Sequence, residues 1–284
     1  MEAIRVRGLR KAYGATVAVD GVDLDVAAGE VFALLGPNGA GKTTTVEILE
    51  GYRRRDGGEV SVLGVDPGSR TDVAAHRWRD RVGIVLQGTG EFDELTVGEL
   101  VRHFARFYPA ADDPAVVIER VGLTEKAGAR THTLSGGQKR RLDVALGIVG
   151  RPELLFLDEP TTGFDPEARH EFWGLVRDLQ ADGTTILLTT HYLEEAEALA
   201  DRVGVIARGR LIAVDTPRSL GRRDSALATV SWRTPEGAWE RTQSATPTAV
   251  VADLAARFSG EVPGLTVTRP TLEDVYLDMI GGAA

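Results

Sequence analysis

The sequence predicts an α/β fold with a parallel sheet at its core, followed by a smaller α+β domain. An apolar run at residues 31–35 leads directly into a glycine-rich turn and then a helical pattern. Two further apolar runs, residues 154–157 and 185–188, are separated by a helix-like stretch, which is the alternation expected of a parallel sheet with crossover helices. After residue 217 the pattern changes to a hairpin followed by short helices. These observations predict domains at residues 1–217 and 218–284.

Composition narrows the class of protein. The chain has 284 residues, 43% hydrophobic and 26% charged, which excludes a mainly disordered or fibrous chain. Lys and Arg number 33 against 42 Asp and Glu, and this net charge of -9 argues against nucleic acid as a partner. The chain contains no cysteine, so disulfides and thiolate chemistry are excluded and an intracellular compartment is expected.

No segment of the sequence predicts export or membrane insertion. Charges recur every second or third position near the start, and no apolar run there has the length of a signal peptide. No window reaches the ~20 apolar residues needed to cross a bilayer. If the protein serves a membrane, we expect another chain to cross it.

The first half of the chain combines two apolar periodicities. Apolar residues near period two between Ile4 and Val26, broken by Gly14, predict antiparallel strands at the start. The continuous run at 31–35 predicts a strand that is covered on both faces. Between about residues 88 and 150 we expect a helical insertion, because the spacing becomes helical. Its first apolar face comprises Val97, Leu100, Val101, Phe104 and Phe107.

The second half contains the remaining strands and the seam between the domains. A hairpin is expected over residues 203–214 around Arg208 and Gly209, with the seam at residues 215–217. Residues 226–232 and 238–243 predict a second hairpin, and Thr246 and Pro247 predict the start of a helix that runs to Phe258. A short strand follows at Val267. Residues 271–274 have capping-box spacing and predict the start of a last helix.

A phosphate-binding loop follows the first buried strand. Residues 36–43, GPNGAGKT, fit GxxxxGK[ST] between a strand and a helix, a context that disfavours a chance glycine turn. Backbone N–H groups converge on phosphate oxygens in such a loop, Lys42 supplies a cation near the β and γ phosphates, and Thr43 offers a hydroxyl to Mg²⁺. The residues expected to contact nucleotide are Gly36, Pro37, Asn38, Gly39, Ala40, Gly41, Lys42, Thr43 and Thr44.

Two carboxylates end the strand at residues 154–157. Open α/β sheets bind ligands at the carboxyl ends of their strands, so Asp158 is expected to face Mg²⁺. Glu159, one step further, is expected to accept a proton from a water in line with the γ-phosphate, or to orient that water. A surface acidic pair is the alternative. Asp158 follows Lys42 by about 116 residues, which disfavours compact GTPases and small kinases.

A third motif, LSGGQ at residues 134–138, precedes a helical stretch and offers a second anion-binding helix terminus. The order GxxxxGK, LSGGQ, LLFLDE resembles the ATP-binding cassette (ABC) family. The resemblance implies a P-loop NTPase fold, with a mixed sheet core, an antiparallel β subdomain and an inserted helical subdomain. It also implies a head-to-tail homodimer. In that dimer, one chain's signature motif closes over ATP held by the other chain through Ser135, Gly136, Gly137 and Gln138.

The resemblance assigns further roles. Tyr13 is similar to the aromatic residue that stacks on adenine, although a solitary tyrosine in a β-rich start is otherwise an ordinary core or edge residue. Gln87 resembles the glutamine that approaches Mg²⁺ and the attacking water, and His191 resembles the switch histidine that contacts the γ-phosphate. Phe164 stands where the family most often has leucine, in a loop that packs across the dimer. The implied catalytic residues are Glu159, His191, Gln87 and Lys42, and the implied Mg²⁺ ligands are Thr43, Gln87 and Asp158.

The segment PTLEDVYL near the end of the chain resembles the C-terminal extension of daunorubicin-type drug-resistance exporter ATPases, although a stability or dimerisation element is an equal alternative. The implied function is hydrolysis of MgATP at the cytoplasmic side of the cell membrane. The chain would bind there peripherally to a separate transmembrane permease and energise export of a small hydrophobic or drug-like molecule. A soluble ABC ATPase acting on ribosomes or nucleic acid is the alternative, but such proteins usually carry paired cassettes, coiled coils or zinc cysteines. LSGGQ disfavours a P-loop kinase or GTPase.

Overall fold

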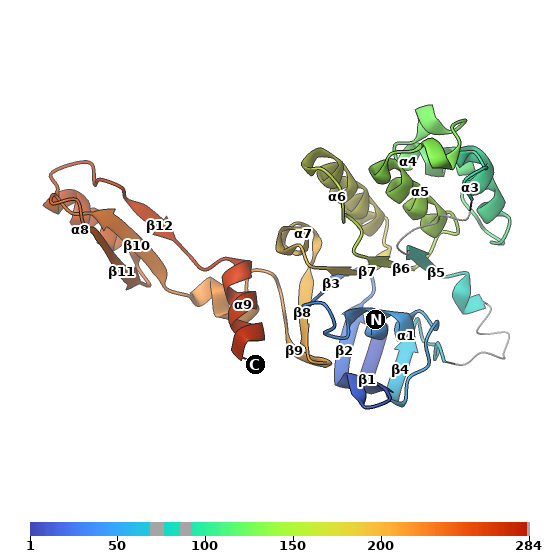
Figure 1. Cartoon of the computed structure of the whole chain (residues 1–284), viewed down its shortest axis with the longest axis horizontal. Coiled ribbons are helices and arrows are strands. Elements are labelled where there is room, and N and C mark those ends of the chain that lie inside the picture. Colours follow the sequence, from blue (N-terminus) through green and yellow to red (C-terminus); the bar gives the residue numbers. More distant parts are fainter. Residues whose placement is uncertain (69–76, 86–91, 283–284) are drawn as a thin grey trace. The chain divides into compact units, whose positions relative to one another are not determined.

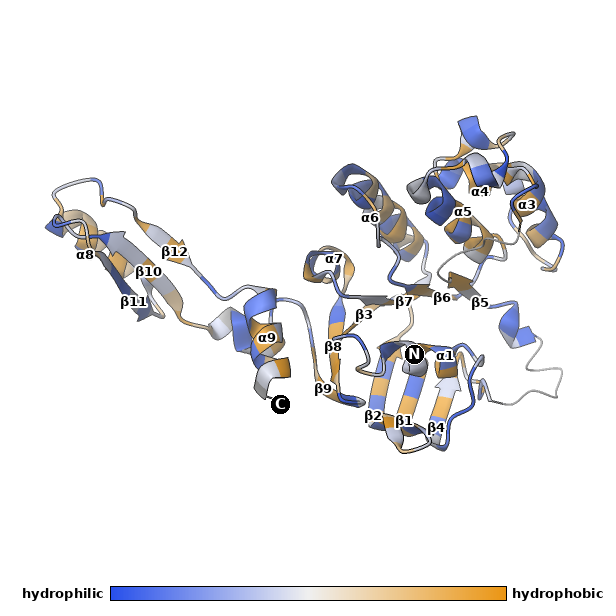
Figure 2. Cartoon of the chain, in the orientation of Figure 1, coloured by the Kyte–Doolittle hydropathy of each residue, from blue (hydrophilic) through white to orange (hydrophobic). Residues whose placement is uncertain are grey.

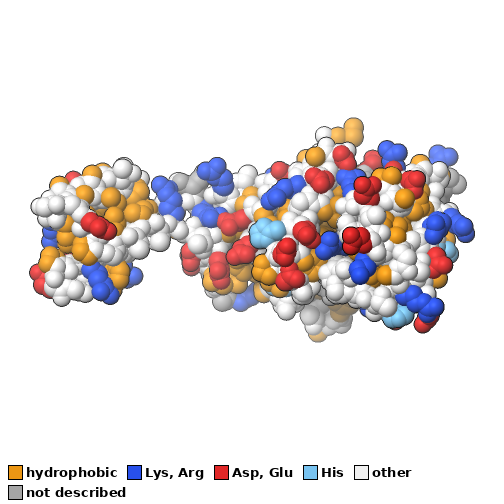
Figure 3. All heavy atoms as spheres, turned by 90° about the horizontal axis from the view of Figure 1, so that it is seen from above, with side chains coloured by type: hydrophobic (Ala, Val, Ile, Leu, Met, Phe, Trp, Pro, Cys, Tyr) orange, Lys and Arg blue, Asp and Glu red, His pale blue; other side chains and the backbone are white. Residues whose placement is uncertain are grey.

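The computed structural model describes residues 1–68, 77–85 and 92–282. They divide into two compact units, Met1–Val214 and Asp215–Ala284, which we call the N-terminal and C-terminal units (Figure 1). No helix within the described ranges is long and apolar enough to cross a membrane. On the face seen in Figure 3, acidic and basic side chains are interspersed over the surface.

A six-stranded sheet forms the centre of the N-terminal unit, in the order β5-β6-β7-β3-β8-β9. The neighbouring pairs from β5 to β8 are parallel, and every residue of β3 and β7 is buried, as expected for a sheet covered on both faces. Arg208 and Gly209 both have positive φ, 51° and 77°, as a tight hairpin turn requires. The strands are β3 (Val31–Leu35), β5 (Val82–Val85), β6 (Leu154–Asp158), β7 (Thr185–Thr190), β8 (Arg202–Ala207) and β9 (Arg210–Asp215).

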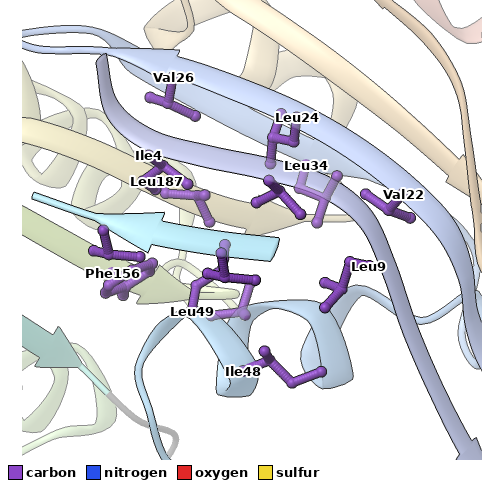
Figure 4. Close-up of a cluster of buried hydrophobic side chains, with 14 of the residues drawn as sticks. Ile4, Leu9, Val22, Leu24, Val26, Leu34, Ile48, Leu49, Phe156 and Leu187 are labelled. Carbon is purple, nitrogen blue, oxygen red and sulfur yellow. The ribbon is translucent and has the colours of Figure 1, made fainter. Parts of the chain in front are cut away.

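A second, antiparallel sheet has the order β2-β1-β4, from β1 (Glu2–Tyr13), β2 (Thr16–Ala27) and β4 (Gly57–Val62). Figure 2 shows alternating hydrophobic and hydrophilic bands along β1 and β2, the pattern of strands with one buried face. Ile4 and Leu24 on this sheet pack with Leu34, with Leu49 of helix α1 (Lys42–Leu49) and with Phe156 in one buried cluster (Figure 4). The two sheets therefore share a core, and α1 lies in it.

The predicted helical insertion contains α3 (Val97–Ala105), α4 (Pro114–Arg120) and α5 (Gly136–Ile148), with short 3₁₀ turns at Thr124–Lys126 and Thr131–Thr133. Phe107 was wrongly assigned to its first apolar face. Helix α3 ends at Ala105, and the Phe107 side chain is 65% exposed. Helix α6 (Pro166–Ala181) connects β6 to β7, and α7 (Leu193–Leu199) connects β7 to β8.

The C-terminal unit is built on a three-stranded antiparallel sheet, β11-β10-β12. Its core contains Val230, Trp232, Leu254 and Val262. Thr271 and Asp274 form the predicted capping box, whereas the Thr246 side chain makes no cap hydrogen bond. The elements are η3 (Leu220–Ser225), β10 (Ala228–Arg233), β11 (Trp239–Ser244), α8 (Pro247–Arg257), β12 (Thr266–Thr268) and α9 (Leu272–Gly282).

Candidate nucleotide-binding site

Residues 36–41 form a tight loop between β3 and α1, and glycine is required at two of its positions. A Cβ atom at Gly36 would lie 2.4 Å from the Ile206 carbonyl oxygen, and one at Gly41 would lie 2.3 Å from the Ala18 carbonyl oxygen. Gly41 also has φ of 106°, in the left-handed region. The loop is therefore held close to two neighbouring strands, and a side chain at either glycine would displace it.

Helix α1 begins at this loop without a side-chain cap. Gly41 is the N-cap residue and makes no side-chain hydrogen bond, and the first N–H groups of a helix have no acceptor inside it. Free N–H groups at a helix N-terminus, together with the helix dipole, attract phosphate oxygens. The geometry at this end of α1 thus suits a polyphosphate chain.

Lys42 is buried at the start of α1, only 6% exposed. Its Nζ donates hydrogen bonds to the carbonyl oxygens of Gly36, at 2.7 Å, and Pro37, at 3.3 Å. Burial lowers the pKa of Lys42, while the carboxylates of Glu159 and Asp158 oppose that shift. The lysine therefore brings a positive charge to the inside of the loop, next to the acidic end of β6.

Asp158 and Glu159 lie at the carboxyl end of β6, beside Thr189 of β7. Thr189 Oγ1 donates a hydrogen bond to Asp158 Oδ1, and the Glu159 N–H donates to the Thr189 carbonyl oxygen at 3.1 Å. Glu159 has φ of 44°, an uncommon value for a residue with a Cβ, because the chain turns sharply as it leaves the strand. The neighbouring strand therefore holds the carboxylate of Asp158 and the backbone of Glu159.

His191 follows the end of β7 and reaches the same place. Its Nδ1 lies 3.3 Å from Glu159 Oε2, and the His191 side chain is 43% exposed. Thr162 Oγ1 donates to the same Glu159 oxygen at 3.4 Å. The structure thus brings Glu159 and His191, which are far apart in the sequence, into contact.

Tyr13 ends β1 with a ring that is partly open to solvent, since the residue is 42% exposed. Two cations lie against this ring. Lys11 Nζ is 5.4 Å and Arg53 Cζ is 5.3 Å from the ring centroid. An aromatic face with exposed area of this kind can stack a planar base.

Residues 134–138 form the start of α5. Ser135 Oγ accepts a hydrogen bond from the Gln138 N–H at 3.3 Å, and Gln138 Oε1 accepts one from the Ser135 N–H at 3.0 Å. This capping box leaves Ser135 and Gly136 exposed. Among the described residues, no hydrogen bond or ion pair joins residues 135–138 to residues 36–44. The starts of α1 and α5 in one chain are therefore not joined by a hydrogen bond or ion pair in the part of the chain that the structure describes.

Two residues that were not predicted from the sequence hold the turn at residues 158–160, which carries Asp158 and Glu159. Arg140 of α5 is buried, and it donates to the carbonyl oxygens of Asp158, at 2.6 Å, and Pro160, at 3.1 Å. Thr189 is the second, through its contacts with both carboxylate residues. The sequence carries no signal for the burial of Arg140, and for Thr189 it offers only a hydroxyl residue two positions before His191.

Two other expectations concern Gln87 and Phe164. Gln87 lies outside the described residues. Phe164 is buried and packs edge-on against Phe172 of α6 in its own chain, with ring centroids 5.9 Å apart. The larger ring that replaces leucine at this position thus contributes to the core of the N-terminal unit.

Comparison with known proteins identifies the family. A family model for ABC transporters matches residues 19–162, about half of the chain. The chain belongs to the ABC transporter family. The family match spans the phosphate loop, the signature motif and the acidic strand, so the fold class inferred from those motifs is confirmed.

Relatives of this ABC protein include ATP-binding proteins named for export. The Nod factor export ATP-binding protein I of Burkholderia orbicola (strain AU 1054) is 40% identical over 299 residues, which covers 98% of this chain and 97% of that protein. The daunorubicin/doxorubicin resistance ATP-binding protein DrrA of Streptomyces peucetius is 45% identical over 223 residues, or 77% of this chain and 66% of that one. A solved structure of an ATP-binding subunit of an ABC transporter covers 98% of this chain and 99% of its own at a TM-score of 0.71 and 23% identity. The chain is an ATP-binding subunit of an ABC transporter, and the expectation of an ATPase is confirmed.

Proposed function

We propose that this ATPase hydrolyses MgATP as a head-to-tail homodimer and energises export through a separate transmembrane permease. The observation that carries the proposal is the contact between Glu159 and His191 at the carboxyl end of β6, with Asp158 and Lys42 beside it. A base, a mobile hydrogen-bonding ring, a metal-binding carboxylate and a phosphate-binding cation are the groups that phosphoryl transfer to water needs.

Binding of ATP is assigned to residues 36–44, with adenine stacked on Tyr13. Lys42 would exchange its two carbonyl partners for β- and γ-phosphate oxygens. The oxygen donors Thr43, Asp158 and Gln87 fit Mg²⁺, which prefers hard oxygen ligands and keeps several waters. When bound, the ion would offset the negative charge of the β and γ phosphates.

Hydrolysis is assigned to Glu159, which orients a water toward the γ-phosphorus and accepts its proton as the bond to ADP breaks. Thr189 holds the backbone of Glu159 for this role, and Thr162 and His191 contact its carboxylate. His191 would turn from Glu159 to a γ-phosphate oxygen when ATP is present. Its partly exposed ring leaves room for that movement.

Dimerisation is supported by the exposed start of α5. Ser135, Gly136 and their helix N-terminus contact no phosphate loop in their own chain, and they have the chemistry of an anion site. In a head-to-tail pair they would close over ATP held by the other chain. Each chain would then contribute to two nucleotide sites.

The permease proposal is supported by the export proteins among the relatives and by a hollow in the N-terminal unit. The hollow has a volume of about 540 Å³ and lies between the end of α1, residues 78–85, α3 and α5. Its lining is mainly apolar, as expected for a surface that receives a segment of another protein. This arrangement would hold the chain at the cytoplasmic side of the membrane. The named relatives favour a small hydrophobic or drug-like cargo.

The C-terminal unit is proposed to be an accessory domain that acts in coupling, with the boundary near residue 217. Every residue assigned to ATP lies between Tyr13 and His191. A role of residues 218–284 in transport is therefore separable from nucleotide binding.

Replacing Glu159 by Gln tests the proposal. The change keeps the shape of the side chain but removes the base, so turnover should fall by ~10² or more while MgATP still binds. Phosphate release measures turnover, and sizing columns run with MgATP should contain an accumulated ATP-bound dimer. The matched control is Glu153→Gln, an exposed carboxylate 2.7 Å from Arg81 that lies outside the assigned set, and it should keep normal turnover. Turnover of Glu159→Gln within threefold of wild type would refute the assignment.

A further inference from the structure

Glu50 is a buried carboxyl group with no apparent structural partner. It is the C-cap residue of α1, only 8% exposed, and it lines the 540 Å³ hollow. Across residues 1–68, 77–85 and 92–282, no hydrogen bond or ion pair to its carboxylate occurs within the chain. Burial, with the carboxylates of Asp158 and Glu47 nearby, raises the pKa of Glu50 to about 7.

The other charges at the hollow do not neutralise Glu50. Arg79 lines the hollow but is exposed and forms no ion pair with Glu50. Asp143 also lines it, and Arg140 lies 3.8 Å from that carboxylate. A buried carboxylate without a cation is costly, and polar groups of this kind are usually paired.

The remaining lining is apolar and continues onto the surface. Trp78, Val82, Phe104 and Leu146 are among the lining residues. Phe104 packs edge-on against Phe107, with ring centroids 6.0 Å apart, and the Phe107 side chain is 65% exposed. The lining is thus mainly apolar, and of its two buried carboxylates Asp143 has Arg140 beside it whereas Glu50 has no cation among the described residues. Such a surface suits an amphipathic segment that carries one basic side chain.

We infer that the segment of the membrane subunit that occupies this hollow carries a Lys or Arg side chain that pairs with Glu50. The inference rests on the proposed function, and it names the determinant by which the chain selects its permease. A segment with a neutral or acidic side chain at that position would leave Glu50 buried and unpaired, so it would bind more weakly. Pairing places a cation where the low dielectric makes the attraction strongest.

The test is a double-mutant cycle between the full chain and a transmembrane protein co-expressed with it as the membrane subunit, reconstituted in lipid nanodiscs. Glu50→Gln is the first change, since Gln keeps the size of the side chain and removes its charge. The second changes are single Lys→Gln or Arg→Gln substitutions in the cytoplasmic loops of the membrane subunit. Affinity is measured by titrating the chain onto the nanodiscs, and Glu153→Gln serves as the matched control.

We expect Glu50→Gln to weaken binding at least tenfold and Glu153→Gln to change it less than about twofold. One loop substitution should weaken binding of the wild-type chain to a similar extent and have little further effect in the Glu50→Gln background. Wild-type affinity of Glu50→Gln, or additive losses for every loop residue, would overturn the inference while leaving the permease proposal intact. Failure of the wild-type chain to bind the membrane subunit would overturn both.

Discussion

The two units of this protein bury different kinds of side chain. In the described part of the C-terminal unit, the buried residues are apolar, from Val230 and Trp232 to Leu272. The N-terminal unit also buries polar and charged side chains, namely Glu30, Lys42, Thr45, Glu50, Thr131, Arg140, Asp143, Thr161, Thr185, Thr189, Thr190 and Glu195. Several of these belong to the proposed nucleotide site. The C-terminal unit is thus organised by hydrophobic packing, whereas the N-terminal unit also accommodates desolvated groups that the proposed chemistry would use.

The largest expected effect comes from removing one buried aromatic ring from the core of each unit. Trp232→Ala and Phe156→Ala each remove a large buried ring, at a cost of ~3–5 kcal/mol to the unit that contains it. Only Phe156→Ala should abolish ATP turnover, because β6 carries Asp158 and Glu159. Urea unfolding followed by circular dichroism measures the loss of stability, and phosphate release measures turnover. A tenfold loss of turnover in Trp232→Ala with a folded N-terminal unit would contradict the separation.

The next effect concerns pH. Because the folded state keeps the proton on Glu50 between about pH 4.5 and 7 while the unfolded chain releases it, the free energy of unfolding falls as pH rises through that window. The full contribution is about 3 kcal/mol. The Glu50→Gln variant lacks this pH-dependent contribution. The free energy of unfolding of the variant minus that of wild type should therefore increase by about 3 kcal/mol from pH 5 to pH 8. Urea titrations of both proteins check this, and an equal gap at the two pH values would contradict it.

Removal of the C-terminal unit tests whether ATP binding depends on the N-terminal unit alone. A chain that ends at Pro217 keeps every residue assigned to ATP and should bind MgATP within about tenfold of the full chain, or ~1.4 kcal/mol. Transport with the membrane subunit should fall. Calorimetry on monodisperse truncated protein and an efflux assay in cells provide the two measurements. Loss of ATP affinity in a well-folded truncation would place the C-terminal unit in the nucleotide site, and undiminished efflux would remove it from coupling.

The smallest effect compares two helix caps. Ser135→Ala and Thr271→Ala each remove a capping oxygen and should cost their helices about 1 kcal/mol. Amide hydrogen exchange of α5 and α9 measures that loss. Only Ser135→Ala should also reduce turnover, because its helix start is proposed to contact the other chain's ATP. Equal turnover in the two variants would argue against a shared site.

The sequence predicted best what depends on local chemistry. The prediction of a phosphate loop at residues 36–43 depends on glycines and a lysine at fixed spacing, and the prediction for Asp158 depends on two carboxylates that end an apolar run. Periodicity likewise predicted strands in both units, but not β4 (Gly57–Val62) or β5 (Val82–Val85). Phe107 was wrong because the apolar spacing continues past Ala105, where the helix ends.

The features that the sequence did not predict depend on contacts between segments that are distant in the chain. Arg140 looks like one more charge on a helix until the fold brings it to the carbonyl oxygens of Asp158 and Pro160. Glu50 follows the end of an ordinary helix, and its burial beside a hollow lined by distant segments is seen only in the fold. No local pattern encodes burial that arises in this way.

The backbone at Glu159 has a consequence for protein engineering. A residue with φ of 44° is a natural target for stabilisation, because glycine relieves the strain of a side chain in the left-handed region, for a gain of roughly 1 kcal/mol. A design procedure that optimises stability alone would therefore select Glu159→Gly. The resulting protein would have less backbone strain at this position but would lack the carboxylate that the proposed reaction requires.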